Sequence, residues 1–424
     1  MANPWKDPDL GKTGNQLCGE RAQRLADAYA LKQPDRIPSS IILGHFLAEY
    51  GGITRQELYE NGDKCQELLE KASLYLQADS LMGVVGGPAV SKILGDQMTK
   101  WPGYGLGPDG DFQFNEHEFM KPEDYDAFLE DPSDWALRKY LPRAFTALQG
   151  LAFMPPTAMF NFGFYHTWNF PAYAIPPVAA AFDALNKAIQ ASAAGIPPML
   201  AGFQRMAELG FAPGLNLAIL VEAPFDFMSD TLRGMRGIFL DMKRIPEKLL
   251  AAEEKALHFE LDFAISTARG MGIKEVFIPL HRGSDGFMSL EQYEKFYWPT
   301  FKALMLGLIE AGLTPVVFYE GVWDQRLKYL AELPKGKSVG MFQNSDIFKV
   351  KEVVGDTMCI VGGMPVSMLR NGTHEQIRDW TKRLCQEVGK GGGFVMSTNI
   401  GEMEGCDIEL IKVWIDATKE FGTY

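Results

Sequence analysis

The second half of the chain alternates short apolar runs with long amphipathic segments, and this alternation limits the fold more than any other feature. The runs are nearly continuous in apolar residues, as strands buried on both faces are. The order of strand, helix and strand predicts a parallel sheet with right-handed crossovers. The predicted strands are 215–223, 275–280, 315–319, 338–342, 358–362 and 393–397.

Long helices are predicted between these strands, over 246–271, 289–311 and 373–388. The second and third begin with capping boxes, in which Ser289 precedes Gln292 and Thr373 precedes Gln376 by three residues. Six strand and helix units in about half of a 424-residue chain fit the later part of an eight-stranded barrel. We therefore expect a single (β/α)8 TIM-type barrel domain over 1–424, with an open, doubly wound sheet as the alternative.

The first 210 residues are less periodic. Helices are predicted over 56–76 and 174–207, the second broken at Pro197 and Pro198, and 80–90 is predicted to hold the first barrel strand and its loop. Glycine, proline, aromatic and acidic residues without any period fill the start of 101–135, which indicates a lid-like loop. Residues 1–75 are assigned to a helical N-terminal extension.

Charge and cysteine content exclude several classes of protein. The chain has 41 basic and 54 acidic residues and a net charge of −13, so a nucleic-acid partner is not expected. No apolar run is long enough for a membrane helix, and the first 20 residues lack the pattern of a signal peptide. The five cysteines are scattered without a paired motif, which indicates reduced thiols. We expect a cytoplasmic protein.

The residues that end the predicted strands are unusually polar. In α/β barrels the carboxyl ends of the strands form the active site. Glu222, His281 and Glu320 end three successive predicted strands and are the candidate catalytic residues, which would bind a divalent metal or a polar substrate. The alternative is that strand ends meet water and are polar for that reason. Other strand ends are Arg282, Gly321, Gln343–Asn344, Gly363–Met364 and Ser397–Thr398–Asn399.

A dense aromatic segment lies at 161–170, with the sequence NFGFYHTWNF. Packing in a core is the usual role of such a stripe. The interspersed glycine and asparagine are more typical of a loop, and on that basis Tyr165, His166 and Trp168 are candidate substrate-binding residues.

Four stretches resemble the uroporphyrinogen decarboxylase superfamily, which includes the porphyrin decarboxylase and corrinoid-linked methyltransferases. They are FMSLEQYEKFYWPTFKALMLGLIEAGLTPVVF, SDIFKVKEVVGDTMCIVGGMPVSML, GKGGGFVMST and IELIKVWIDATKEFG. The resemblance implies one α/β barrel with a deep pocket at the C-terminal mouth. The arginine-rich loop typical of the decarboxylases is missing, which favours the methyltransferase branch.

The chain departs from that branch at its usual zinc motifs. Where the branch has histidine, any residue, cysteine and glycine, this chain reads Phe318–Tyr319–Glu320–Gly321. The second zinc motif of the branch is a turn with a cysteine near the C-terminus, and the corresponding residues 397–400 of this chain contain no cysteine. The usual thiolate site therefore does not form. Glu320 takes a ligand position, and together with Glu222 and His281 it makes an oxygen-rich set for which zinc is a candidate. Cys406 is a substitute thiol a few residues beyond the usual place.

These residues, read with the resemblance, imply a methyltransferase component that moves a methyl group between a small methylated substrate and a corrinoid. Loss of the thiolates disfavours a thiol substrate, whereas a methyl ether or methylamine needs a proton on its leaving atom. His281 or Glu320 would be the acid and Glu222 would position it. The substrate would be held by Arg282, Gln343 and Asn399 and surrounded by Tyr165, Trp168, Phe225 and Phe318.

The chain has no corrinoid-binding Asp-x-His-x-x-Gly motif, so a corrinoid would come free or on a separate corrinoid protein. Two other functions remain open at this point: a decarboxylase or lyase on the same fold, and a non-catalytic small-molecule binding protein. We also consider a homodimer.

Overall fold

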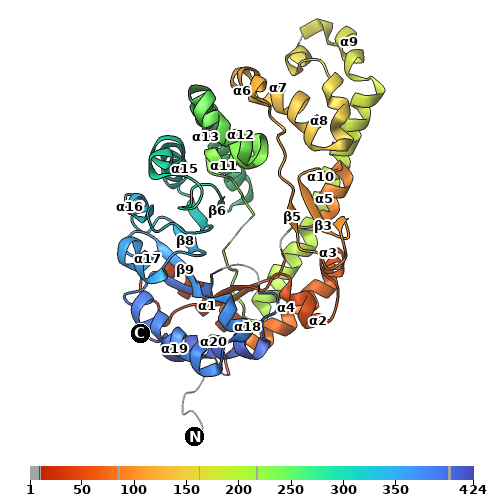
Figure 1. Ribbon diagram of the computed structural model, residues 1–424. Coiled ribbons are helices and arrows are strands. Elements are labelled where there is room, and N and C mark those ends of the chain that lie inside the picture. The colour runs from red at the N-terminus through yellow and green to blue at the C-terminus, as the bar shows by residue number, and fades with distance from the viewer. Residues whose placement is uncertain (1–8, 10, 85, 162, 216–217, 400–402) are drawn as a thin grey trace.

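The computed structural model describes residues 9, 11–84, 86–161, 163–215, 218–399 and 403–424. Its main sheet has five parallel strands in the order β10-β9-β8-β7-β6 (Figure 1). The order is that of the chain, as the alternation of strands and helices predicts. The strands are β6 (Glu275–Leu280), β7 (Thr314–Tyr319), β8 (Val339–Phe342), β9 (Cys359–Met364) and β10 (Phe394–Thr398).

Three further parallel segments extend this sheet at its two edges. Strands β1 (Ser40–Ile42) and β2 (Ser80–Met82) pair with each other, and Ser39 forms a parallel bridge to Met396 of β10. At the other edge Leu220 forms a parallel bridge to Phe277 of β6. Among the described residues no ladder joins β2 to the segment around Leu220, and the fold is a mixed α/β fold.

Two of the predicted strands differ from the structure. The segment 80–90 contains the second strand of the structure, and the first strand is β1. The sequence does not predict β1, because only three of its residues pair and such a short run gives no periodic signal. The predicted strand 215–223 contributes a single bridge rather than a ladder, and residues 216–217 of it lie outside the described residues.

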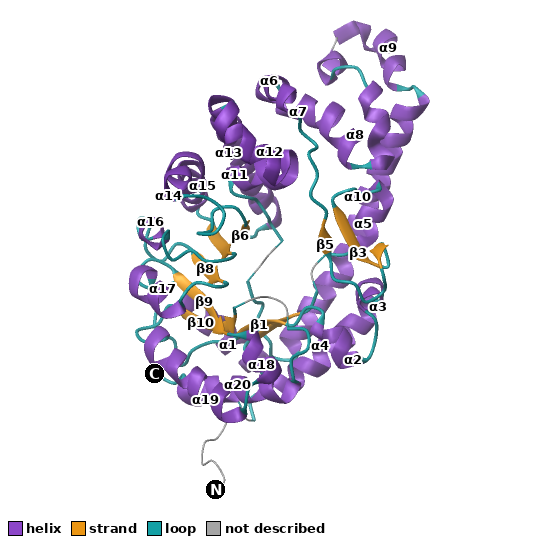
Figure 2. Cartoon of the chain, in the orientation of Figure 1, coloured by secondary structure: helices purple, strands orange, loops and turns teal. Residues whose placement is uncertain are grey.

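Helices form an outer layer around the strands (Figure 2). Both predicted capping boxes are present, at Ser289 and Thr373. Helix α13 (Pro246–Met271) has the predicted bounds. The other helices of this half are α11 (Pro224–Asp226), α12 (Gly234–Arg244), α14 (Leu290–Gln292), α15 (Trp298–Glu310), α16 (Leu327–Leu330), α17 (Ile347–Val354), α18 (Val366–Asn371), α19 (His374–Arg383) and α20 (Ile408–Phe421).

The predicted helix 56–76 is two helices, because Asn61 ends the first and its side chain caps the second by accepting from the amide of Lys64. Strands β3 (Thr99–Pro102), β4 (Gly105–Leu106) and β5 (Gln113–Phe114) form a small sheet at the start of the predicted lid, and this sheet begins two residues earlier than the predicted bound of 101. The helices of this half are α1 (Gly14–Tyr29), α2 (Phe46–Gly51), α3 (Arg55–Glu60), α4 (Gly62–Leu76), α5 (Pro88–Leu94), α6 (Tyr125–Glu130), α7 (Pro132–Trp135), α8 (Leu141–Ala144) and α9 (His166–Asn169).

Helix α10 (Pro176–Glu208) runs from the strand region into an arm that carries α9 at its far end (Figure 1). The predicted break at Pro197 and Pro198 is wrong, since α10 continues through both prolines. A proline removes one amide donor and crowds the preceding turn. Here that turn consists of Ala193, Ala194 and Gly195, which are small and exposed, so its carbonyl groups are open to water.

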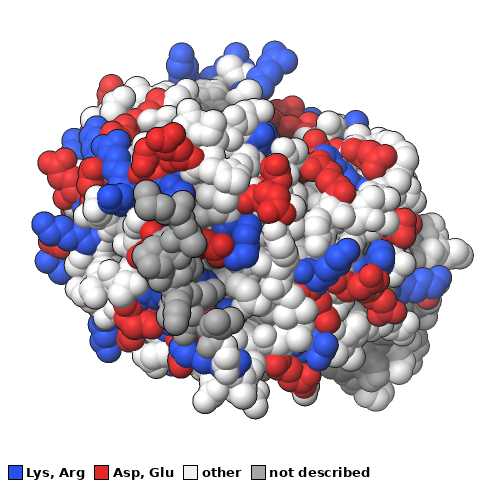
Figure 3. Space-filling view, turned by 90° about the horizontal axis from the view of Figure 1, so that it is seen from below, with Lys and Arg blue, Asp and Glu red and all other residues white. Residues whose placement is uncertain are grey.

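No helix of the described residues is long and apolar enough to cross a membrane. On the face drawn in Figure 3, acidic and basic side chains are interspersed, and neither sign forms a continuous patch. All five cysteines are free.

Candidate functional site

His281, directly after β6, is the centre of a cluster of charged residues at the carboxyl ends of the strands. Its Nδ1 atom lies 2.5 Å from Oδ2 of Asp230, and its Nε2 atom lies 3.5 Å from Oε2 of Glu320. Burial works against the charged imidazole, but the hydrogen bond to Asp230 and the charges of Asp226, Asp230 and Glu320 outweigh it and raise the pKa of His281 to about 9. The ring is therefore an imidazolium at neutral pH.

Asp226 fixes the backbone around His281 by accepting hydrogen bonds from it. Its fully buried carboxyl group accepts from the amides of His281 and Arg282, at 3.1 and 2.9 Å, and from the Tyr297 hydroxyl at 2.6 Å. Burial and the nearby Asp230 raise the pKa of Asp226 to about 6. The donors around this carboxyl group fix the turn after β6.

Glu222 lies beside Asp226 and His281, on the segment whose Leu220 bridges to β6. Thr231 donates its hydroxyl to Oε2 of Glu222 at 3.0 Å. Burial, followed by the charges of Asp230 and Asp226, raises the pKa of Glu222 to about 7. The amide of Glu222 donates to Glu260 at 2.9 Å, and burial and Glu222 keep the pKa of Glu260 well above its ordinary value. Glu222 can thus gain or lose a proton near neutral pH.

Arg282 connects the cluster to the predicted lid. Its Nε donates to Asp230 at 2.8 Å, and an η-nitrogen lies 3.3 Å from Glu116. Glu116 also lines a cavity of about 620 Å³ between the lid segment and α12, whose other charged walls include Arg236 and Arg244. A small molecule in this cavity would lie next to the Arg282 side of the cluster.

Gln343 and Asn399 hold neighbouring loops together. The Gln343 side chain accepts from the amide of Gly321 at 2.7 Å, at a φ of +76° that favours glycine. The Asn399 side chain accepts from Val366 at 3.1 Å and donates to the Gln343 carbonyl at 3.2 Å. Phe318 and Asn399 line a small cavity that also touches β1 and β8. The structure brings both amides to the strand ends, where their predicted role in substrate binding stays a prediction.

The aromatic segment of the arm is not brought together with the cluster. Tyr165 and Trp168 are 55% and 66% exposed and pack on each other and on Phe164, at the end of the arm (Figure 1). The side chain of His166 lies outside the described ones. Phe225 is fully buried and packs on Tyr297, behind the cluster. Pocket roles for these residues remain predictions.

Sequence reasoning missed Asp226 and Asp230, which organise the cluster. The signal was present, since both follow Glu222 at intervals of four residues in EAPFDFMSD and so share one face of a helix. Neither residue ends a strand, because both lie in the helical turns that follow Leu220, so the pattern of strand ends does not single them out.

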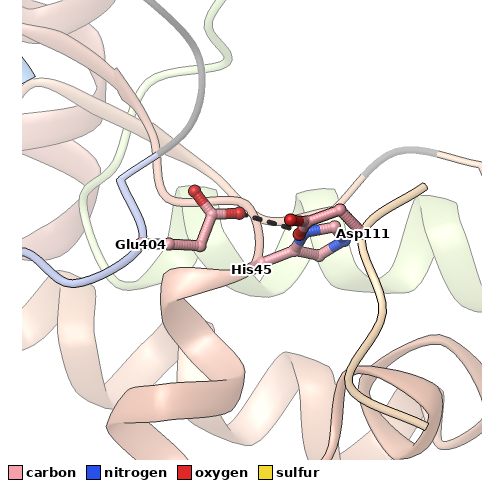
Figure 4. A group of neighbouring side chains, drawn as sticks. All are labelled: His45, Asp111 and Glu404. Carbon is pink, nitrogen blue, oxygen red and sulfur yellow. Dashed lines mark hydrogen bonds and ion pairs between the residues drawn. The ribbon is translucent and has the colours of Figure 1, made fainter. Parts of the chain in front are cut away.

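Within the part of the chain that the structure describes, two groups of side chains have metal-ligand geometry. Glu222, Asp230 and His281 place one ligand atom each within 4.8 Å of one another, and so do His45, Asp111 and Glu404. In the second group (Figure 4), Nδ1 of His45 lies 3.0 Å from Glu404, while Arg55 pairs with Asp111. Each group thus has one carboxylate already paired with an arginine, Asp111 with Arg55 and Asp230 with Arg282. Cys406 is buried, with its sulfur 4.0 Å from the Val366 carbonyl, and joins neither group.

The strands and the acid–base cluster at their carboxyl ends define an α/β protein with an enzyme-like site. Residues 160–421 match the family model described as uroporphyrinogen decarboxylase (URO-D). Because the match covers more than half of the chain, the chain belongs to this family, and the resemblance seen in the sequence is confirmed.

Comparison with solved structures gives 28 chains of similar fold. One is a methyltransferase from Methanosarcina mazei, with a TM-score of 0.59 and 15% identity over 95% of this chain and 98% of that chain. At this identity the likeness shows a shared fold. No curated protein matches the sequence.

Proposed function

We propose that this chain is a methyltransferase component that moves a methyl group between a small methyl ether or methylamine and a corrinoid. Family membership and the fold shared with a methyltransferase support this proposal. The observation that carries it is the geometry of His281 at the strand ends, where Asp230 holds one nitrogen of the ring and Glu320 faces the other. A charged ring with a proton to give is what a departing alkoxide or amine requires.

The proposal assumes the architecture of a (β/α)8 barrel with an N-terminal extension and a lid. Eight parallel segments follow one another in chain order from β1 and β2, through Leu220, to β10. Their carboxyl ends would then form one mouth, on which Glu222, His281 and Glu320 meet.

In the proposed reaction the carbon–oxygen or carbon–nitrogen bond of the substrate breaks, and His281 gives its Nε2 proton to the leaving atom. Glu320 faces that nitrogen and stabilises the charged ring before transfer. Glu222, with a pKa of about 7, can return a proton to the cluster after turnover. General acid catalysis of this kind contributes roughly 10²–10⁴-fold to the rate.

A corrinoid would supply the nucleophilic cobalt that accepts the methyl group. Because the sequence lacks a corrinoid-binding motif, we propose that it arrives free or on a separate corrinoid protein. The free state of all five cysteines agrees with a reducing compartment such as the cytoplasm.

Zinc fits the donor set of Glu222, Asp230 and His281 chemically, since carboxylate oxygens and an imidazole bind it. A metal on His281 would take the place of a proton, so metal binding and the acid role exclude each other at this ring. Elemental analysis of the purified protein decides between them.

Porphyrinogen decarboxylation is less well supported by the site. The cluster contains Glu222, Asp226, Asp230, Glu260 and Glu320, and its two cations, Arg282 and His281, are both already paired with Asp230. Such a site repels a polycarboxylate substrate.

The proposal is tested by incubating the chain with reduced corrinoid protein and a panel of methyl ethers and methylamines. The methylcobalamin spectrum should appear with at least one substrate and should be lost with His281→Gln. His258→Gln is the matched control, because His258 lies on α13 with its side chain 72% exposed. Release of carbon dioxide from a porphyrinogen, or full-rate demethylation without corrinoid, would contradict the proposal.

A further inference from the structure

Helix α10 exposes a long apolar face. No charged residue occurs from Ala188 to Gln204, a stretch of 17 residues on the surface of a chain whose net charge is −13. Soluble proteins rarely leave such a surface in water unless another surface covers it. Its large apolar side chains and their exposed fractions are Phe182 39%, Ile189 67%, Ile196 49%, Met199 44%, Leu200 56% and Phe203 58%.

Four of these side chains repeat at intervals of seven residues: Phe182, Ile189, Ile196 and Phe203. Residues seven apart lie on one side of a helix, and this interval is the one that packs against a second helix. The order Phe, Ile, Ile, Phe is also the same when read from either end. Two copies of the helix in antiparallel orientation would therefore present matching side chains to each other.

The middle of α10 is bare. The N-terminal part packs against Thr146–Phe153, α10 also packs on α5, and the C-terminal part reaches α1 and α4. Between them, every residue from 192 to 201 is exposed, and a side chain added at Gly195 would meet no atom within 4 Å. The centre of the face is rich in alanine, serine and glycine, so a second helix could approach closely.

We propose that this face binds the same face of a second copy of the chain, with the two α10 helices antiparallel about a two-fold axis near residues 192 and 193. Phe182 then meets Phe203 of the second copy, and Ile189 meets Ile196. This is an isologous contact, in which one surface is complementary to itself.

The area is sufficient for such a contact. Six large apolar side chains, each about half exposed, offer roughly 500 Å² per copy, and the pair about 1,000 Å², the lower limit of a specific interface. The antiparallel arrangement also places the arm of each copy near the strand region of the other. The exposed aromatic residues at the end of the arm, Phe164 and Trp168 among them, then add to the contact.

The proposal concerns the surface of α10 and does not depend on the proposed reaction. The mass of the purified full chain, measured by light scattering after size exclusion, should be twice the 47.2 kDa of one chain. Ile189→Glu and Ile196→Glu should each weaken association by roughly 100-fold or more, because each change occurs twice in the contact. Ala194→Glu is the matched control, since Ala194 is exposed on the opposite side of the same helix and should leave the mass unchanged.

Cysteine cross-linking tests the orientation. Ile189→Cys combined with Ile196→Cys should form a disulfide-linked dimer under mild oxidation, whereas either change alone should not. Cross-linking of the single variants would indicate a parallel pair and overturn the proposal. A monomeric mass at tens of micromolar would also overturn the proposal. If Ile189→Glu then impaired methyl transfer from a corrinoid protein, the corrinoid protein would be the partner that covers this face. Circular dichroism should show that all variants are folded, because the changed side chains are exposed.

Discussion

Nδ1 of His281 lies 2.5 Å from a carboxylate oxygen of Asp230, although 51 residues separate the two in the chain. Asp230 also accepts from Arg282, so one carboxyl group fixes both the histidine and the arginine that follow β6. Asp230 is nearly buried, and its charge therefore acts on the ring with little screening by water. This pair sets both the orientation of His281 and the pH range in which the ring can donate a proton.

Asp230→Asn should lower the pKa of His281 from about 9 towards the ordinary value of 6.5. The substitution keeps the size of the side chain but removes the charge that stabilises the imidazolium. A reaction that needs protonated His281 loses rate as pH rises through this pKa. The basic limb of the profile of kcat/KM against pH should therefore move at least one unit lower, which corresponds to about 1.4 kcal/mol.

The control for this shift is Asp262→Asn on α13, which removes the same charge from an exposed position. Its pH profile should match that of the unchanged protein. An Asp230→Asn profile with the basic limb still near pH 9 would show that Asp230 does not set the protonation of His281.

Glu320→Gln should lower the turnover number by roughly 10²–10⁴-fold if Glu320 acts with His281 on the reacting group. The Glu320 side chain is 46% exposed, so the substitution should change thermal stability little. Steady-state kinetics with the methyl donor measures the effect. The loss from His281→Gln combined with Glu320→Gln should be smaller than the sum of the single losses, because both residues serve one step.

Glu310→Gln, at the exposed end of α15, is the matched control and should turn over normally. Near-normal turnover by Glu320→Gln would remove this residue from the mechanism and leave the family assignment unchanged.

The later half of the fold could be predicted from the sequence because its strands are buried on both faces and separated by well-capped helices. Strand β6 and helix α13 have the predicted bounds. Strand β1 could not be found in this way, since it pairs over only three residues. The continuity of α10 through Pro197 and Pro198 depends on the small, exposed turn before them, and that exposure is set by the tertiary fold.

The site was predicted in part for the same physical reason. Parallel strands end on one side of a sheet, so Glu320 and His281 were expected to meet, and they lie 3.5 Å apart. The partners that set their chemistry, Asp226 and Asp230, come from the helical turns after Leu220. The direction of those turns depends on packing that strand periodicity does not reveal.

Asp79→Ala should lower the free energy of unfolding by about 3–5 kcal/mol, as expected when one partner of a buried ion pair is removed. Asp79 is fully buried, lies 2.5 Å from Arg24 and 2.8 Å from Arg36, and accepts from the amide of Ser39. The substitution leaves two buried guanidinium groups short of a partner. Urea denaturation measures the loss, and Asp379→Ala on the exposed side of α19 should stay within about 0.5 kcal/mol of the unchanged protein.

Glu222→Gln should reduce the loss of stability that occurs between about pH 5 and pH 7. Burial and the charges of Asp230 and Asp226 raise the pKa of Glu222 from 4.5 to about 7 in the folded protein. The folded chain therefore holds a proton that the unfolded chain releases. The stabilisation that this proton gives to the folded state is complete below pH 4.5 and is lost as pH rises through 7. Glutamine does not ionise and can still accept from Thr231, so the difference in unfolding free energy between pH 5 and pH 7 should shrink by on the order of 1 kcal/mol.

Urea titrations at pH 5, 6, 7 and 8 measure this difference, with Glu310→Gln as the control for the loss of one carboxylate. Parallel stability curves for Glu222→Gln and the unchanged protein would show that Glu222 is ionised throughout this range and is no reservoir of protons for His281.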